Sequence, residues 1–246
     1  MPAQADQPLT GKRVLVVGAA GGVGTAVSRA LAAQGADLVL HGHGRSPAVR
    51  DLADELRRLH GTRPLVVHGD VTEPERIAEI GDILRANACG ALDGIVNCTT
   101  GFDGRPVGLA DLSVKEFRRV IDVDLVGSYV LVHELLPLLT ARPGARVVLF
   151  SSLAAQRGRP GAAHLCAAKA GVQGLALGLA RDLAPHGVAV HVVAPGPIGH
   201  HGGPTGVPTS TAVQVADVVA VLVSPRGDLL REQVLVLQGN QPTPVS

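Results

Sequence analysis

Ser152–Lys169 reads S-L-A-A-Q-R-G-R-P-G-A-A-H-L-C-A-A-K and follows directly on R-V-V-L-F-S, an apolar run that predicts a buried strand. Lys169 stands within alanine, glycine and leucine residues that predict a long helix over 161–184. Only three of the 22 Lys and Arg residues in this chain are lysines. Because a buried ammonium is costly unless it is paired or used, we interpret Lys169 as a specified site residue. The alternative is a lysine that extends along an exposed helix face into solvent.

Outward from this stretch, short apolar runs alternate with segments of helical pattern. The predicted strands cover residues 12–18, 36–41, 64–68, 92–97, 146–152, 188–193 and 233–238. The predicted helices cover 25–35, 47–60, 161–184 and 211–223, and two more begin near Thr72 and at Ser113. Ser113 and Glu116 form a capping-box pattern at the start of a helix that is interrupted near Pro137. This alternation predicts an α/β fold, a Rossmann-like, doubly wound and mainly parallel sheet of seven strands flanked by helices.

Length and composition narrow the class of protein. A chain of 246 residues without an internal repeat or a linker predicts one domain over 1–246, with 1–10 and 240–246 flexible or packed on a partner. The net charge of +1 is scattered and argues against a nucleic-acid partner, and the lack of a long apolar run argues against a membrane span. Cys89, Cys98 and Cys166 stand apart without metal-ligand spacing, which predicts no metal site and a cytoplasmic location.

Glycines gather between the first predicted strand and the first predicted helix, in G-A-A-G-G-V-G. Gly18, Gly22 and Gly24 allow a tight turn there and a close approach of backbone to a pyrophosphate at the helix N-terminus. Val23 lies in the same turn. The turn therefore predicts a dinucleotide site, with close packing of the strand and helix as the alternative.

The glycine spacing G-x-x-x-G-x-G, together with Ser152 and Lys169, resembles the short-chain dehydrogenase/reductase family. In that family a tyrosine stands thirteen positions after the serine and four before the lysine. Position 165 of this chain is leucine. The resemblance thus implies an atypical member that lacks the phenol used for proton transfer.

The resemblance also assigns contacts to the cofactor. Asp70 and Val71, after the third predicted strand, match the pair that meets the adenine. Asn97 matches the first residue of the family's N-N-A-G, although 98–100 read C-T-T here. The other cofactor contacts that the resemblance implies are the loop residues Pro195, Gly196 and Ile198.

The end of the second predicted strand bears on the choice of cofactor. An acidic residue there would accept hydrogen bonds from the ribose hydroxyls of NAD and repel a 2′-phosphate. The segment L-H-G-H-G-R-S contains none. His43 and Arg45 can instead donate hydrogen bonds to a phosphate, which favours NADP(H); an exposed arginine in a loop is the alternative.

In the family, Ser152 would hold the carbonyl oxygen of the substrate, and Lys169 would bind the nicotinamide ribose and lower the pKa of the tyrosine. Leu165 cannot carry a proton. Tyr129 is the only tyrosine of the chain and lies in the middle of a predicted helix, where a core or subunit contact is expected. Asp124 stands where the family has an asparagine, and its carboxylate can pair with Lys169.

Other groups are candidates for the missing proton donor. His164 is next to Leu165 but about 100° around the helix, and Cys166 fits a packing role. His200 and His201 follow P-G-P-I on the loop that borders nicotinamide and substrate in the family. We expect His164 or His200 to supply or direct the proton, with a structural or solvated histidine as the alternative in each case.

Three functions fit these residues. The first is an NADP(H)-dependent oxidoreductase that reduces a ketone or quinone without the usual tyrosine. The second is a non-redox dehydratase, cyclase or isomerase on the same fold, and the third is a catalytically silent partner protein. The expected substrate is a small molecule, bulky or aromatic because the segment after Pro197 is short and open. The resemblance further implies a homodimer or homotetramer paired through the helices that begin at Ser113 and Gly161.

Overall fold

A computed structural model describes residues 7–87, 89–199, 210–230 and 234–238. Within them seven strands form one sheet in the order β3-β2-β1-β4-β5-β6-β7, and every neighbouring pair is parallel. The strands are β1 (Arg13–Val17), β2 (Asp37–Gly42), β3 (Leu65–His68), β4 (Gly94–Asn97), β5 (Arg146–Phe150), β6 (Ala189–Pro195) and β7 (Val234–Leu237). The predicted Rossmann-like sheet of seven strands is confirmed.

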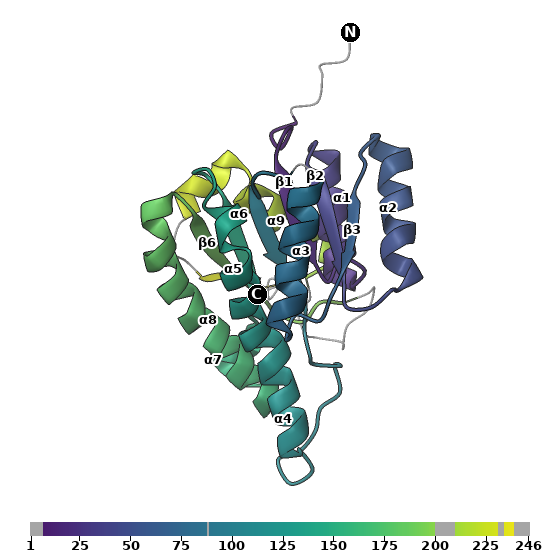
Figure 1. Ribbon diagram of the computed structural model, residues 1–246. Helices are drawn as coiled ribbons and strands as arrows, with labels where there is room; N and C mark the ends of the chain where they lie inside the picture. Colours follow the sequence, from purple (N-terminus) through teal and green to yellow (C-terminus); the bar gives the residue numbers. More distant parts are fainter. Residues whose placement is uncertain (1–6, 88, 200–209, 231–233, 239–246) are drawn as a thin grey trace, which may run out of the picture.

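Helices cover both faces of the sheet (Figure 1). On one face pack α1 (Gly22–Ala33), α2 (Pro47–His60) and α9 (Ala212–Val223). The other face carries α3 (Pro74–Ala86), α5 (Gly127–Glu134), α6 (Leu136–Leu139) and α8 (Ala163–Leu183). The shorter elements are α4 (Val114–Ile121), the π-helical turn η1 (Asp122–Val126), α7 (Ala154–Arg157), and the 3-10 turns η2 (Ala184–His186) and η3 (Pro225–Leu230). Among the described residues, no helix is long and apolar enough to cross a membrane.

Each strand sends alternate side chains into two separate cores. Leu15 and Val17 of β1 join the core under α3, α5 and α8, whereas Val14 and Val16 join the core under α1, α2 and α9. Because both faces are covered, the strands are apolar throughout rather than alternating. The cores contain mainly Val, Leu, Ile and Ala, as the low aromatic content predicts.

The strand order reverses between β1 and β4, and this reversal places the site. β1 leads through α1 to β2 on one side, and β4 continues to β5 on the other. In doubly wound sheets, ligands bind outside the carboxyl ends of the strands at this switch point. In Figure 1 this edge faces down, where α4 and α7 extend past the sheet.

Several boundaries differ from the sequence-based expectations. β5 ends at Phe150 rather than at residue 152, because Ser152 turns into α7. The helix expected from Thr72 starts at Pro74, since Thr72 bonds to Asp70 instead. Ser113 Oγ accepts from the Glu116 N–H as predicted. The helix that follows widens into η1 and ends at Glu134.

The N-terminal arm is partly built into the chain's own core. Leu9 is fully buried, and its N–H donates to the carbonyl of Gln34 at the end of α1. Leu9 therefore fastens the end of this arm to α1. Residues 1–6 and 239–246 lie outside the described residues.

Candidate functional site

The turn between β1 and α1 has the shape that a pyrophosphate needs. Gly18 has a φ of 73°, which favours glycine, and a Cβ at Gly24 would lie 2.1 Å from the Gly18 carbonyl oxygen. Gly21 is the N-cap of α1, and no side chain caps the helix. The N–H groups of Gly22, Val23 and Gly24 therefore point from the helix end without a side-chain acceptor. These features fit the bound phosphates of a dinucleotide.

Polar residues surround the carboxyl ends of β2 and β3. The exposed His43 imidazole Nδ1 lies 3.7 Å from Asp70 Oδ2, and Thr72 donates to Asp70 Oδ1 from its N–H and its hydroxyl, at 2.9 and 2.7 Å. Partial burial raises the pKa of Asp70, but the bonds from Thr72 outweigh it and lower that pKa overall. Arg45 is exposed and has no ion-pair partner in the described part of the chain. Val71 is buried beside them.

His41 lies buried beneath this polar edge. Its Nε2 is 3.0 Å from the carbonyl oxygen of Gly69, and its Nδ1 has no partner among the described residues. A carbonyl only accepts, so Nε2 is the donor in this contact. Burial lowers the pKa of His41 to about 4, against the opposing effect of the Gly69 bond.

Asn97, at the end of β4, holds the strand against η1. Its amide oxygen accepts from the N–H and hydroxyl of Thr99, at 3.2 and 2.7 Å. Its amide nitrogen donates to Ser128 Oγ at 3.0 Å, and Ser128 Oγ donates in turn to the Asp124 carbonyl at 2.6 Å. The amide oxygen and one amide N–H of Asn97 are thereby used for positioning.

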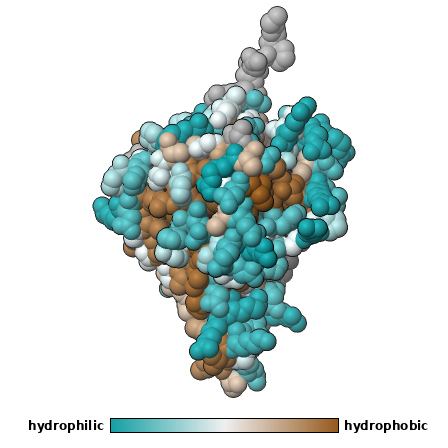
Figure 2. Space-filling model, in the orientation of Figure 1, coloured by the Kyte–Doolittle hydropathy of each residue, from teal (hydrophilic) through white to brown (hydrophobic). Residues whose placement is uncertain are grey.

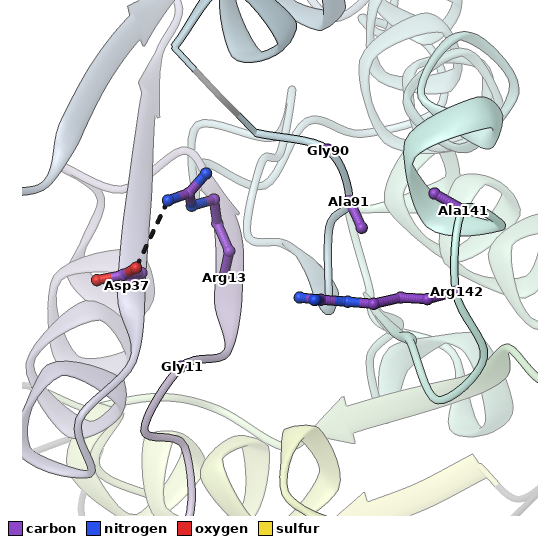
Figure 3. Close-up of a pocket in the computed structure, with 7 residues that line it drawn as sticks. All are labelled: Gly11, Arg13, Asp37, Gly90, Ala91, Ala141 and Arg142. Atoms are coloured by element: carbon purple, nitrogen blue, oxygen red, sulfur yellow. Dashed lines mark ion pairs between the residues drawn. The ribbon is translucent and has the colours of Figure 1, made fainter.

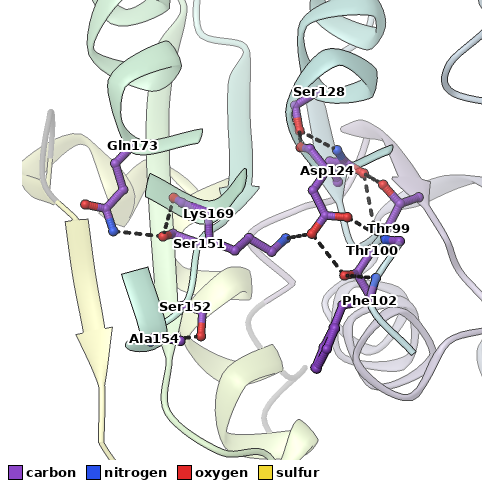
Figure 4. Close-up of polar contacts among 12 residues, drawn as sticks. Thr99, Thr100, Phe102, Asp124, Ser128, Ser151, Ser152, Ala154, Lys169 and Gln173 are labelled. Atoms are coloured by element: carbon purple, nitrogen blue, oxygen red, sulfur yellow. Dashed lines mark hydrogen bonds and ion pairs between the residues drawn. The ribbon is translucent and has the colours of Figure 1, made fainter. Parts of the chain in front are cut away.

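Lys169 and Asp124 form a buried ion pair at the centre of the site (Figure 4). Lys169 Nζ is 3.0 Å from Asp124 Oδ2, and the two side chains are 7% and 0% exposed. The Thr100 hydroxyl donates to the same carboxylate oxygen at 3.0 Å, and the Gly101 N–H donates to the other. Figure 4 shows the lysine extending from α8 across to η1. The pairing anticipated from sequence is present.

Ser152 lies after β5 with its hydroxyl only partly used. Its Oγ accepts from the Ala154 N–H at 3.2 Å, so its proton is available to a substrate oxygen. The preceding Ser151 is buried and has a structural role. Ser151 Oγ donates to the Lys169 carbonyl and accepts from Gln173 Nε2, each at 2.8 Å, which ties β5 to α8.

The first turn of α8 contains Leu165 and the candidate His164, both buried. The His164 ring makes an edge contact with Phe102, with centroids 5.3 Å apart, and its Nδ1 has no partner among the described residues. The Arg159 guanidinium lies 5.3 Å from the Phe102 ring centre. Phe102 is thus in contact with both His164 and Arg159 beside the site.

The loop after β6 completes the described part of the site. Pro195 is the last residue of β6, its carbonyl accepts from the Leu153 N–H, and the Gly196 N–H donates to Leu237. Ile198 pairs with Ser210 in an isolated bridge. His200, His201 and the open segment expected after Pro197 lie outside the described residues, apart from Ile198 and Gly199.

A different hollow lies at the opposite edge of the sheet. It measures about 410 Å³ and lies between Arg13, Asp37 and Arg142 (Figure 3). Arg13 and Asp37 form an ion pair at 3.6 Å, and Arg142 binds the buried Asp93. None of the predicted site residues lines it.

Sequence reasoning missed three residues of the site. Thr100 was noticed only as a departure from the family's N-A-G, yet its hydroxyl holds Asp124. Gln173 and Phe102 carried no recognisable signal, because their partners Ser151 and His164 lie far away in sequence. Gln173 donates to Ser151, the serine directly before Ser152.

The chain belongs to the short-chain dehydrogenase family, because residues 12–201 match that family. It is 32% identical over 188 residues to nodulation protein G of a Rhizobium species, covering 76% of this chain and 74% of the relative. It is 28% identical to an NADPH-dependent aldehyde reductase-like chloroplastic protein of Arabidopsis thaliana, covering 79% and 75% of the two chains.

A solved structure agrees with this assignment. The crystal structure of a short chain dehydrogenase from Burkholderia cenocepacia in complex with NADP superimposes with a TM-score of 0.86 at 28% identity. The similarity covers 95% of this chain and 98% of the other.

Proposed function

We propose that this protein is an NADP(H)-dependent oxidoreductase that reduces a ketone or quinone without a tyrosine proton donor. The observation that carries the proposal is the glycine turn, where the 2.1 Å separation between a Cβ at Gly24 and the Gly18 oxygen excludes any side chain. The bare first turn of α1 supports the same ligand. When bound, the nicotinamide supplies the hydride.

The exposed edge beyond β2 supports the choice of NADP(H) over NAD(H). His43 and Arg45 are both accessible donors, and Arg45 has no competing acid among the described residues. Asp70 is the carboxylate beside His43, and its Oδ1 already accepts two bonds from Thr72. The NADP-bound relative from Burkholderia is consistent with this choice.

At the substrate end, Ser152 would donate its free proton as a hydrogen bond to the carbonyl oxygen and stabilise the charge that develops there. Lys169 would keep Asp124 as its partner and offer its remaining N–H donors to the ribose. The proton on the product oxygen would come from an acidic hydroxyl of the substrate or from His164. Asp124 is committed to three donors and is not the source in this scheme.

The helix α8 supports a homodimer. Its exposed face is small and apolar, comprising Ala163, Ala167, Ala170, Gly174, Leu177 and Gly178. Between Ala163 and Leu177 the only charged residue is the buried Lys169. In Figure 2 a hydrophobic band follows the α8 side of the molecule. A second copy packed helix to helix would cover it.

The three free cysteines are consistent with a reducing, cytoplasmic location.

Titration with NADPH and with NADH tests the proposed function. The chain contains no tryptophan, so the nucleotide's own fluorescence reports binding without an indole background. We expect micromolar NADPH binding and weaker NADH binding, and loss of that difference in Arg45→Ala. Consumption of NADPH with a panel of ketones and quinones then identifies the acceptor. Failure to bind either nucleotide would exclude the oxidoreductase and leave a cofactor-free enzyme or a silent partner.

A further inference from the structure

The Lys169–Asp124 pair is complete without any ligand. Both side chains are almost fully buried, and the carboxylate accepts from Lys169, Thr100 and Gly101. Charges at such depth persist only when they are paired and hydrogen-bonded. The net charge that this pair presents to its surroundings is therefore zero.

Position 165 lies one helical turn before Lys169, on the same face of α8. Leu165 is 6% exposed, so a group placed there would share the buried environment of the pair. An unpaired ammonium at this spacing would favour the ionised form of a phenol at position 165. An ammonium that is already paired with a carboxylate would not favour the ionised phenol. Phenolate would then be a second negative charge in a buried site, and burial disfavours it.

We propose that Asp124 sets the proton chemistry of this site by cancelling the charge of Lys169, so that leucine is tolerated at position 165 and a phenol there would not become acidic. The inference deepens the proposed function, since it gives a physical reason for a reductase site that works without tyrosine. Asp124 is on this view a positioning and charge-setting residue rather than a catalytic one.

The other titratable groups nearby leave this balance unchanged. Cys98 approaches Lys169 from the end of β4, and burial raises the pKa of its thiol to about 12, so it stays neutral. His164 and Cys166 lie on α8 itself, and Arg159 stacks on Phe102 next to His164. The titratable residues Cys98, His164, Cys166 and Arg159 are unchanged in every variant compared below. A difference in titration between the variants therefore reports the effect of Asp124.

The test places a phenol at position 165 and measures its titration. The chain has no tryptophan and one tyrosine, so in a Tyr129→Phe background the ultraviolet absorbance of phenolate reports only the new group. Leu165→Tyr is compared with Leu165→Tyr/Asp124→Asn. The control Leu165→Tyr/Asp122→Asn removes the same charge from an exposed residue of the same π-helical turn.

We expect the phenol of Leu165→Tyr to titrate at or above the ordinary tyrosine pKa of about 10. With Asp124→Asn it should titrate at least about one unit lower, and with Asp122→Asn it should not move. The proposal is overturned if Asp124→Asn leaves the titration unchanged, or if Asp122→Asn lowers it equally. A strongly lowered pKa in Leu165→Tyr alone would also overturn it, so the test survives if the double variant does not fold. The titration needs no cofactor or substrate. A failure of NADPH binding, which would sink the proposed function, is therefore distinguishable from a failure of this proposal.

Discussion

Gly24 approaches Gly18 so closely that a single methyl group at Gly24 would lie 2.1 Å from the Gly18 carbonyl oxygen. The contact is with backbone, which cannot swing away as a side chain would. It holds the start of α1 against the end of β1 and leaves the helix N–H groups facing the sheet edge.

Gly24→Ala should therefore weaken both cofactor binding and folding. We expect the Kd for NADPH to rise by at least about tenfold, or about 1.4 kcal/mol, because the helix end must shift. The overpacking should cost roughly 1–3 kcal/mol of stability. Fluorescence titration and thermal unfolding measure the two effects. Gly90→Ala is the matched control, since nothing lies within 4 Å of a Cβ there. Equal NADPH affinity in both variants would argue against this turn as the phosphate site.

Removal of the Lys169 ammonium should strongly destabilise the protein. In Lys169→Met the Asp124 carboxylate stays buried without its counter-charge, which costs about 3–5 kcal/mol. Urea unfolding followed by circular dichroism measures the loss. Lys115→Met, on the exposed side of α4, should change stability by less than about 0.5 kcal/mol.

The same pair can be tested by a double-mutant cycle. Lys169→Met/Asp124→Asn should lose less than the sum of the two single variants, because no buried charge is left unpaired. Simple additivity would mean that the 3.0 Å contact has no energetic weight.

Sequence patterns were informative where residue identity itself imposes the geometry. Gly18 is needed for its φ of 73° and Gly24 because a Cβ there would clash with backbone, so their spacing predicted the turn. Lys169 stood out because a charge among alanines requires a partner. The partner Asp124 was anticipated only through family register, since the two residues are 45 positions apart and meet through packing of α8 against η1.

The parts that sequence could not supply depend on backbone detail. The π-helical turn η1 changes the register of the helix around Asp124 and has no compositional signature. Thr100 was noticed only as a departure from the family's N-A-G, yet its hydroxyl reaches that turn from the loop after β4. The fifth strand was predicted to end at residue 152 but ends at Phe150. Ser151 still donates its N–H to β6, whereas Ser152 already turns away toward α7.

His41 should make the protein less stable in mild acid. Burial lowers its folded pKa to about 4, whereas the unfolded chain titrates near 6.5, so the unfolded state binds more protons between these values. Stability is complete above pH 6.5, falls as the pH drops toward 4, and levels off below. The loss from this group amounts to roughly 3 kcal/mol.

Replacement of His41 isolates that effect. His41→Gln keeps an N–H donor for the Gly69 carbonyl but cannot take up a proton, so its melting temperature should fall less between pH 7 and pH 4 than that of the unaltered protein. His186→Gln, at an exposed position in η2, should leave the pH profile as it is. A profile in His41→Gln as steep as the original would mean that other groups cause the acid sensitivity.

Leu177 should control the oligomeric state if α8 pairs with a second copy. Its side chain is 59% exposed on the small-residue face, next to Gly174 and Gly178, where a neighbouring helix can approach closely. Leu177→Glu would place a carboxylate in that contact without a partner, and truncating or charging a central interface residue costs about 2 kcal/mol or more. Sedimentation at micromolar concentration should show a dimer for the original protein and a monomer for the variant. Leu59→Glu introduces the same charge at a 65% exposed leucine on α2, away from α8, and should stay dimeric. A monomeric original protein, or equal dissociation by both variants, would rule out pairing through α8 and leave its apolar face for another partner.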